Sequence, residues 1–203
     1  YPCKNNSIQR WDGFKVPWPF YRTFDKNDDR LSVLVGEYMG NDGVLFNEES
    51  DIIKHGNTYS GAVPVKYGED PESTGDGSQI DWIVYRYADV LTLLSEAIVR
   101  QGNSVTQEAV DLLNQIRVRA KLSPYTMGDI KGVDDFLDKM LQERGHEFWW
   151  EGNRRADLIR HGKFIQNAID RGSTTTKPEF VLFPLPQAVI NEGKGIIIQN
   201  PGY

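Results

Sequence analysis

The sequence predicts a mainly α-helical fold, in which tetratricopeptide-like helical hairpins carry long irregular loops and a few short strands. Three observations lead to this prediction. Apolar residues recur at a helical period through residues 84–151. Capping signals separate the periodic stretches, and only a few residues join one stretch to the next. Residues 1–82, by contrast, are rich in proline and glycine and show no sustained period.

The irregular, loop-rich part is expected to span residues 1–82. Short β-like pieces lie at Leu31–Val35 and Ala62–Tyr67, and Asp70–Ser78 is typical of an exposed, turn-rich loop. A long irregular stretch inside a compact protein is usually functional or is held by a scaffold. Ligand contacts are therefore sought first in this part of the chain.

The helical scaffold is expected to span residues 83–162. Gly102 can end its first helix, and Ser104 with Gln107 forms a capping-box pattern for the second. Two helices joined so closely form an antiparallel hairpin, which tetratricopeptide-like arrays and helical bundles both use. The apolar residues at helical spacing are Tyr87, Val90, Leu91, Leu94 and Ile98 in the first helix, and Ala109, Leu112, Leu113, Ile116 and Ala120 in the second.

A third helix is expected from about Val133 to Glu151, then a short helix over Arg154–Arg160 and an extended tail over residues 163–203. A helical projection places Arg144 at the centre of the third helix's apolar stripe, with Glu151 close by. Because a lone buried charge is costly, these residues should be paired. Available partners are each other, Glu143, and Arg154, Arg155, Asp157 and Arg160 on the following helix. The expected ion-pair network comprises Glu143, Arg144, Glu147, Glu151, Arg154, Asp157 and Arg160.

Glu147 and Glu151 also permit a catalytic interpretation, as the paired acids of a glycoside hydrolase. A general acid needs a raised pKa, whereas the arginines near both acids would lower it. A structural salt-bridge network is therefore the preferred interpretation. His146-Glu147 opens like a zinc-protease motif, but Trp150 stands where the second histidine should be. Neither a metal nor another cofactor is predicted.

Composition and charge narrow the class of protein further. The formal net charge of −6 argues against nucleic-acid binding, which needs a basic face. Cys3 is the single cysteine, so no internal disulfide or multi-cysteine zinc site can form. No apolar run approaches the roughly 20 residues of a membrane helix.

Several motifs together carry a resemblance to a known family. The run Glu143–Arg160 (ERGHEFWWEGNRRADLIR) resembles the pattern E-R-x-x-E-F/L-x-x-E-G-x-R-x-x-D-L-x-R of the SusD/RagB family, with every fixed position met. Further stretches look like other signals of that family. They are Arg86–Leu91 (RYADVL) with Glu96 and Ala97, Asn114–Ala120 (NQIRVRA), Phe183–Pro186 (FPLP) and Gln199–Tyr203 (QNPGY).

The resemblance implies a non-catalytic role. Such proteins bind glycans, or sometimes peptides, as nutrients at the outer-membrane surface of Gram-negative bacteria, and they cap a SusC-type TonB-dependent transporter. Family members are typically longer and begin with a signal peptide and a lipidated cysteine. The N-terminal half and the lipid anchor are therefore expected to be missing from this chain, which would contact the membrane only through that anchor. A helical protein–protein adaptor is a further alternative, since the hairpin alone suits it equally well.

An aromatic loop at residues 10–21 is the expected place for ligand contacts, because sugars dock on exposed rings flanked by hydrogen-bonding side chains. The alternative is that Trp18 and Phe20 anchor this loop in the scaffold. Trp82 and Tyr59 are weaker candidates. The candidate ligand-binding residues are Trp11, Asp12, Lys15, Trp18 and Tyr21.

Overall fold

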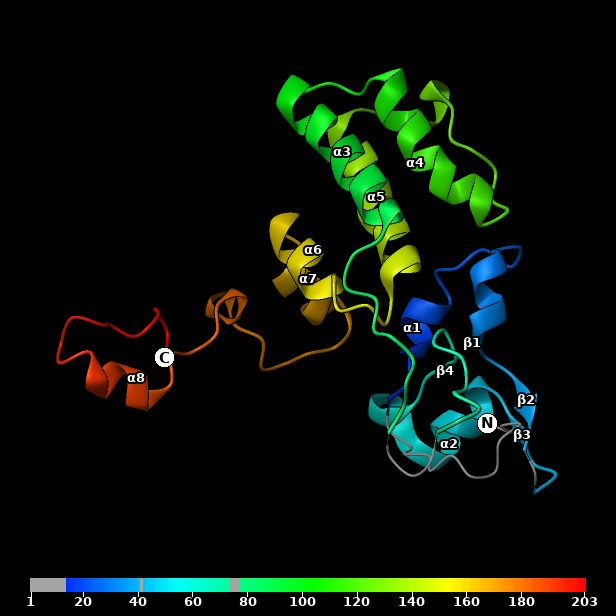
Figure 1. Cartoon of the computed structure of the whole chain (residues 1–203), viewed down its shortest axis with the longest axis horizontal. Helices are drawn as coiled ribbons and strands as arrows, with labels where there is room; N and C mark the ends of the chain where they lie inside the picture. The colour runs from blue at the N-terminus through cyan, green and yellow to red at the C-terminus, as the bar shows by residue number, and fades with distance from the viewer. Residues whose placement is uncertain (1–13, 41, 74–76) are drawn as a thin grey trace. The chain divides into compact units, whose positions relative to one another are not determined.

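The computed structural model describes residues 14–40, 42–73 and 77–203 (Figure 1). The chain forms two compact units. The first ends at Gly152, and the second spans Asn153–Tyr203. The fold is mainly helical with a few two-residue strands, which confirms the predicted fold class.

The helical scaffold consists of α3 (Tyr87–Gly102), α4 (Gln107–Arg119) and α5 (Val133–Phe148), which pack against one another (Figure 1). The short turn between α3 and α4 makes them an antiparallel hairpin, as predicted. Apolar side chains on the facing sides meet in one cluster and are fully excluded from water. They are Val99, Ala109, Val110, Leu113, Phe136 and Met140.

Helix ends differ in detail from the sequence prediction. Asn103, in the left-handed region at φ 45°, follows α3, and the Thr106 hydroxyl accepts a hydrogen bond from the backbone N–H of Ala109. Thr106, rather than the expected Ser104, therefore caps α4. The third helix ends at Phe148, before the expected Glu151, because Trp150 and Gly152 both adopt positive φ.

Short elements organise the irregular part of the first unit. β1 (Leu34–Val35) pairs antiparallel with β4 (Val63–Pro64), and β2 (Tyr38–Met39) pairs with β3 (Leu45–Phe46). The helical turns are α1 (Trp18–Tyr21) and the 3₁₀ turn η1 (Asp29–Val33). A second apolar cluster holds these pieces together and contains Val16, Trp18, Phe24, Leu34, Ala62 and Trp149.

A helix that sequence analysis missed, α2 (Glu48–Tyr59), lies in the region expected to be irregular. Asn47 and Ser50 form a reciprocal capping box that starts it, and three acids in its first turn suit the positive end of the helix dipole. Gly56, at φ 70°, kinks it. The helix has few apolar residues, and its deepest contact is made by the buried carboxylate of Asp51.

The second unit contains α6 (Arg154–Arg160), α7 (Phe164–Asp170), the 3₁₀ turn η3 (Pro178–Val181) and α8 (Gln187–Glu192). The bounds of α6 agree with the prediction. The tail expected to be extended instead holds α7 and α8. Its final residues form hydrogen bonds to the segment before α8, because the Gln199 side chain both donates to and accepts from Leu185.

Within the described residues, no helix has both the length and the apolar character needed to cross a membrane.

Candidate functional site

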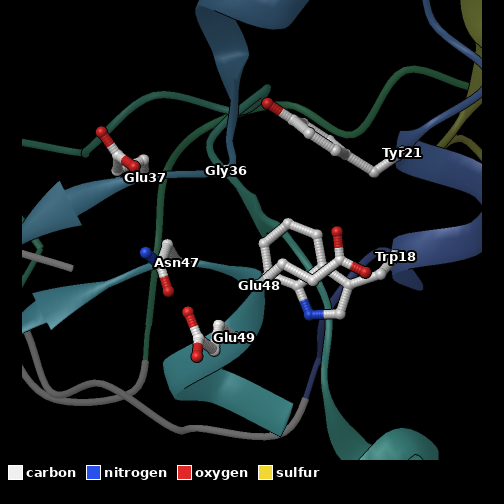
Figure 2. Close-up of a pocket in the computed structure, with 7 residues that line it drawn as sticks. All are labelled: Trp18, Tyr21, Gly36, Glu37, Asn47, Glu48 and Glu49. Carbon is white, nitrogen blue, oxygen red and sulfur yellow. The ribbon is translucent and has the colours of Figure 1, made fainter.

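A pocket of about 390 Å³ lies between α1 and the start of α2 (Figure 2). Two aromatic side chains, Trp18 and Tyr21, extend toward it from α1. Their rings meet edge to face with centroids 5.4 Å apart, and the Tyr21 ring packs closely over Gly36. The polar lining comes from the loop before β2 and from the start of α2, as Glu37, Asn47, Glu48 and Glu49.

Asp51 holds Trp18, one of the residues that line this pocket. Asp51 is only 1% exposed, and its carboxylate accepts hydrogen bonds from Lys15 Nζ at 2.7 Å and Trp18 Nε1 at 3.1 Å. The backbone N–H of Gly61 donates at 2.7 Å, and His55 Nδ1 lies 2.8 Å away. Burial alone would raise the pKa of Asp51, but the bonds from Lys15, Gly61 and His55 outweigh it and lower the pKa.

The structure separates the five predicted ligand residues. Trp11 and Asp12 lie outside the described residues. Lys15 and Trp18 are largely withdrawn from solvent, and Asp51 holds both polar groups. Trp18 therefore anchors the loop in the interior, as the alternative interpretation stated, and presents only part of its surface to the pocket. Tyr21 is half-buried and lines the pocket.

Sequence analysis missed the polar side of the pocket. Asn47, Glu48 and Glu49 approach Trp18 and Tyr21 only because α2 forms, and α2 was not predicted. A usable signal was present, since Asn47 followed three residues later by Ser50 marks a helix start. No local pattern marks Glu37, which the β2–β3 hairpin positions.

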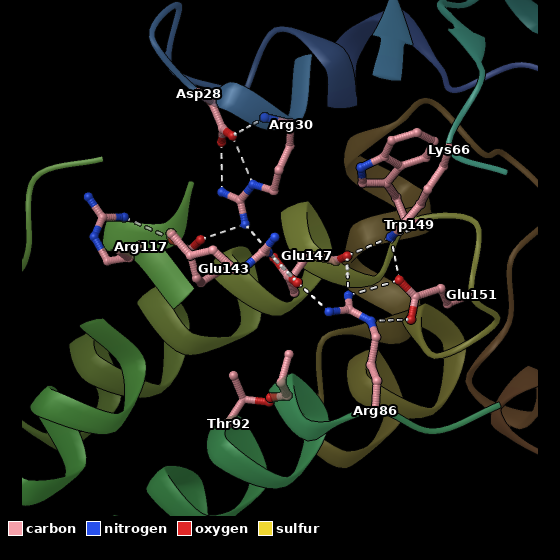
Figure 3. Close-up of polar contacts among 12 residues, drawn as sticks. Asp28, Arg30, Lys66, Arg86, Thr92, Arg117, Glu143, Glu147, Trp149 and Glu151 are labelled. Atoms are coloured by element: carbon pink, nitrogen blue, oxygen red, sulfur yellow. Dashed lines mark hydrogen bonds and ion pairs between the residues drawn. The ribbon is translucent and has the colours of Figure 1, made fainter. Parts of the chain in front are cut away.

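A buried charge network forms the second concentration of polar groups (Figure 3). We use this name for Asp28, Arg30, Lys66, Arg86, Arg117, Arg119, Glu143, Glu147 and Glu151. Glu147 is only 2% exposed, and its carboxylate pairs with Arg30, Arg86 and Arg119. Burial would raise the pKa of Glu147, but these three guanidinium groups outweigh it and lower the pKa.

Glu143 and Asp28 extend the network toward the start of the chain. Glu143 forms ion pairs of 2.8 Å with Arg30 and with Arg117. Arg30 also forms a two-pronged contact with Asp28, through Nε at 2.8 Å and Nη2 at 2.7 Å. The 3₁₀ turn η1 is thereby fixed to α5.

Glu151 joins two segments that are far apart in sequence. Arg86 donates from Nε to Oε2 at 2.8 Å and from Nη2 to Oε1 at 2.9 Å, and Lys66 Nζ pairs with Oε1. Lys66 and Arg86 also both donate to the backbone carbonyl of Glu147, at 2.7 and 2.8 Å. The contacts of Lys66 and Arg86 therefore bring the two ends of the intervening segment, residues 67–85, together at Glu151.

The structure gives these acids partners that the sequence prediction did not name. Glu143, Glu147 and Glu151 pair with cations from segments upstream of α5, namely Arg30, Lys66, Arg86, Arg117 and Arg119. Arg144 is buried as predicted, and its Nη1 donates to Asp89 Oδ1 at 2.7 Å and to Thr92 Oγ1 at 2.6 Å.

The predicted network members on α6 belong to the second unit. Arg160 Nη2 donates to Asp157 Oδ1 at 2.9 Å. Burial lowers the pKa of Arg154, and the charge of Asp157 offsets only part of that effect.

Glu147 and Glu151 have the properties of structural ion-pair partners, not of a catalytic pair. They are 2% and 7% exposed, and their carboxylate oxygens form ion pairs with arginine side chains. A general acid needs a raised pKa, whereas that of Glu147 is lowered. The chemistry that these acids can perform is to neutralise arginines and to hold loops on α5.

Two of the weaker candidates are exposed. Trp82 is 60% exposed and stacks on Tyr67 with ring centroids 4.8 Å apart, and Tyr59 is 75% exposed. Neither lines the pocket.

Comparison with known proteins gives the wider context. A model of the SusD family matches residues 15–203. The starch-binding protein SusD of Bacteroides thetaiotaomicron is 27% identical over 165 residues, which cover 78% of this chain and 27% of that protein. The SusD-like protein P38 of Formosa agariphila is 38% identical over 90 residues, which cover 41% of this chain and 18% of that protein.

The fold is similar to that of solved structures as well. A SusD homolog from Bacteroides thetaiotaomicron superposes with a TM-score of 0.71 at 21% sequence identity, over 93% of this chain and 44% of that structure. The chain thus spans less than half the length of these relatives. Since the family model matches nearly all of the described residues, the chain belongs to the SusD family.

Proposed function

We propose that this protein binds glycans at the cell surface without transforming them, and that the pocket beside Trp18 and Tyr21 holds the ligand. Family membership supports the proposal, because the SusD family is a family of non-catalytic glycan-binding proteins. The starch-binding protein SusD is one of the matched relatives. The observation that carries the proposal is the pocket's mixed lining, in which aromatic ring surface and polar side chains face the same space.

The chemistry of sugars explains why this lining matters. A pyranose ring has an apolar face that packs on aromatic carbon, and hydroxyl groups that need hydrogen-bonding partners. Tyr21 provides an aromatic ring on which a sugar can pack, and the carboxylates of Glu37 and Glu49 can accept hydrogen bonds from sugar hydroxyls. Asn47 Oδ1 is engaged in the helix cap, so Asn47 would contribute through its amide nitrogen. Because the Trp18 indole is held by its hydrogen bond to Asp51, the aromatic part of the pocket is already formed before a ligand binds.

Isothermal titration calorimetry against a panel of oligosaccharides and peptides tests the proposal. We expect saturable binding of at least one oligosaccharide, and at least roughly tenfold weaker binding by Tyr21→Ala, since each 1.4 kcal/mol corresponds to a factor of ten. Tyr85→Ala is the matched control, because Tyr85 is 84% exposed and does not line the pocket. Thermal melts of both variants separate lost contact from lost folding. Binding of peptides alone, or equal losses in both variants, would count against the glycan pocket.

Delivery to a SusC-type TonB-dependent transporter is the second part of the proposal, and family membership supports it. Surface location at the outer membrane, through a lipid anchor on a longer form of the protein, is the third. Size-exclusion chromatography with the purified cognate transporter should yield a complex, and protease treatment of intact cells should degrade the protein. The absence of a complex would contradict delivery, and protection from the protease would contradict the surface location. Glycan binding itself is tested separately by the titrations.

The hydrolase alternative has a simple test in a reducing-sugar assay. We expect no release of reducing ends from any oligosaccharide that binds, because Glu147 and Glu151 are buried and paired. Turnover that disappears in Glu147→Gln with folding intact would overturn the assignment of these acids to a structural role.

A further inference from the structure

We infer that the pocket selects its glycans by charge, taking neutral or amino-sugar oligosaccharides and rejecting those that carry carboxylates or sulfates. This inference rests on the proposed function, because it names the ligand class of the same pocket.

The lining residues supply the first argument. Of the seven described residues that line the pocket, three are glutamates, namely Glu37, Glu48 and Glu49, and none carries a positive charge. Carboxylates exposed to solvent are ionised at neutral pH. A sulfate or uronate entering the pocket would therefore meet charges of its own sign, which costs binding free energy even after solvent screening.

Within the described part of the chain, the nearby cations do not reverse this balance. Arg22 pairs with Glu48, and its side chain is 56% exposed, so it neutralises at most one of the three acids. Lys15 is paired with Asp51 at 2.7 Å, and its side chain is only 9% exposed. Neither Arg22 nor Lys15 is among the lining residues.

The N-terminus of α2 is also a poor binding site for anions. The N-terminus of a helix ordinarily attracts anions through free backbone N–H groups and the helix dipole. Here the Asn47 side chain accepts from the Ser50 N–H at 3.0 Å, and the Ser50 hydroxyl accepts from the Asn47 N–H at 2.9 Å. With that cap in place and Glu48 and Glu49 in the first turn, the dipole is already complemented by the protein's own acids.

A sugar hydroxyl or ammonium, by contrast, finds suitable partners. A neutral hydroxyl can donate to a carboxylate oxygen in a charge-assisted hydrogen bond. The ammonium group of an amino sugar adds an ion pair to that bond. We therefore expect affinity to decrease in the order amino sugar, neutral sugar, uronate or sulfate.

The test compares oligosaccharides of one linkage and one ring configuration: an oligoglucose, the matching oligoglucosamine, in which an ammonium replaces the 2-hydroxyl, and the matching oligoglucuronate, in which a carboxylate replaces the 6-hydroxymethyl group. Titrations are made with the purified chain at low salt and at about 0.5 M sodium chloride, where screening is strong. Analogous galactose and mannose series cover other sugar stereochemistries. We expect the uronate to bind at least about tenfold more weakly than the neutral form at low salt. High salt should narrow that gap.

Glu49→Gln tests the pocket directly, and Glu108→Gln is its matched control. Both residues are exposed glutamates in the first turn of a helix, but only Glu49 lines the pocket. We expect Glu49→Gln to reduce the preference for neutral over uronate ligands, and Glu108→Gln to leave it unchanged. Uronates that bind as tightly as neutral forms at low salt would overturn the charge inference and leave the proposed function standing. A complete absence of glycan binding would remove both.

Discussion

Asp51 is the residue on which the aromatic side of the pocket depends. The buried carboxylate contacts Lys15, Trp18, His55 and the Gly61 backbone, so residues 15–18, the helix α2 and the turn at Gly61 meet at a single side chain. A network with this many satisfied contacts is specific, because losing its charge leaves several donors unmatched at once.

The substitution Asp51→Asn tests this role. The amide keeps the shape of the side chain but leaves the Lys15 ammonium without its buried counter-charge, so we expect a loss of about 3 kcal/mol in the free energy of unfolding. Urea denaturation measures it. Asp134→Asn is an exposed control in the first turn of α5 and should change stability by less than about 0.5 kcal/mol. Equal effects of the two substitutions would show that Asp51 is not an anchor.

Asp51 and Glu147 together predict how stability depends on pH. Both carboxyl groups have lowered pKa values in the folded protein, so the unfolded chain binds their protons more readily. Their stabilising contribution is complete above the unfolded values of about 3.9 and 4.3, and it is lost as the pH falls through the lower folded values. We expect the free energy of unfolding to decrease steeply below about pH 4. A flat profile between pH 5 and 3 would contradict the assigned pKa directions.

At the scale of elements, Glu151 joins the two ends of the segment 67–85. Its carboxylate pairs with Lys66, just before the segment, and with Arg86, just after it. Within the segment, Asp70 accepts a hydrogen bond from the Gln79 N–H at 2.7 Å. The stacked pair Tyr67 and Trp82 lies just inside the two ends. The loop is therefore held at its base and again within its span.

Glu151→Gln should loosen this loop while the helical scaffold persists. The neutral amide cannot hold both cations, so we expect the Gln79 amide to exchange with deuterium at least roughly tenfold faster, which corresponds to about 1.4 kcal/mol of lost protection. Amides in α4 should keep their protection. Glu108→Gln serves again as the control, since it removes a carboxylate outside the network. Uniform acceleration across the first unit would mean that Glu151 supports the whole unit rather than this loop.

In the second unit, Gly202 allows the final residues to approach η3. It has φ 91°, and a Cβ added there would lie 2.5 Å from Cγ of Glu179. Gly202→Ala should therefore reduce stability by about 1–3 kcal/mol beyond the cost of the positive φ alone. Gly172→Ala is the control, with φ 89° and nothing within 4 Å of the added Cβ. Limited proteolysis of the two variants measures the difference, and equal cleavage rates would mean that the added Cβ is accommodated.

Across the whole molecule, the sequence predicted the long scaffold helices but not the contacts between distant segments. Helical periods and caps depend on neighbours in the chain, so the scaffold of α3, α4 and α5 was visible in advance. The burial of Arg144 was visible for the same reason, because helical geometry alone sets which residues share a face.

The partners of the buried acids were not predictable in the same way. Arg30, Lys66 and Arg86 lie 61–117 residues from Glu147 or Glu151 along the chain, and no local period links them. Likewise, the pocket depends on α2, a helix with few apolar residues that is fixed by a capping box and by the buried carboxylate of Asp51. Trp18 was predicted to contact ligand because the exposure of a side chain cannot be deduced from its residue type. In the structure Trp18 is buried and donates a hydrogen bond to Asp51.

The crystal structure of this protein with the tightest-binding oligosaccharide of the panel tests the central claim most directly. We expect an intact sugar in the pocket, packed against Tyr21 and with hydroxyl oxygens within about 3.2 Å of the carboxylate oxygens of Glu37 or Glu49. A sugar bound elsewhere with the pocket empty, or a cleaved sugar, would contradict the account.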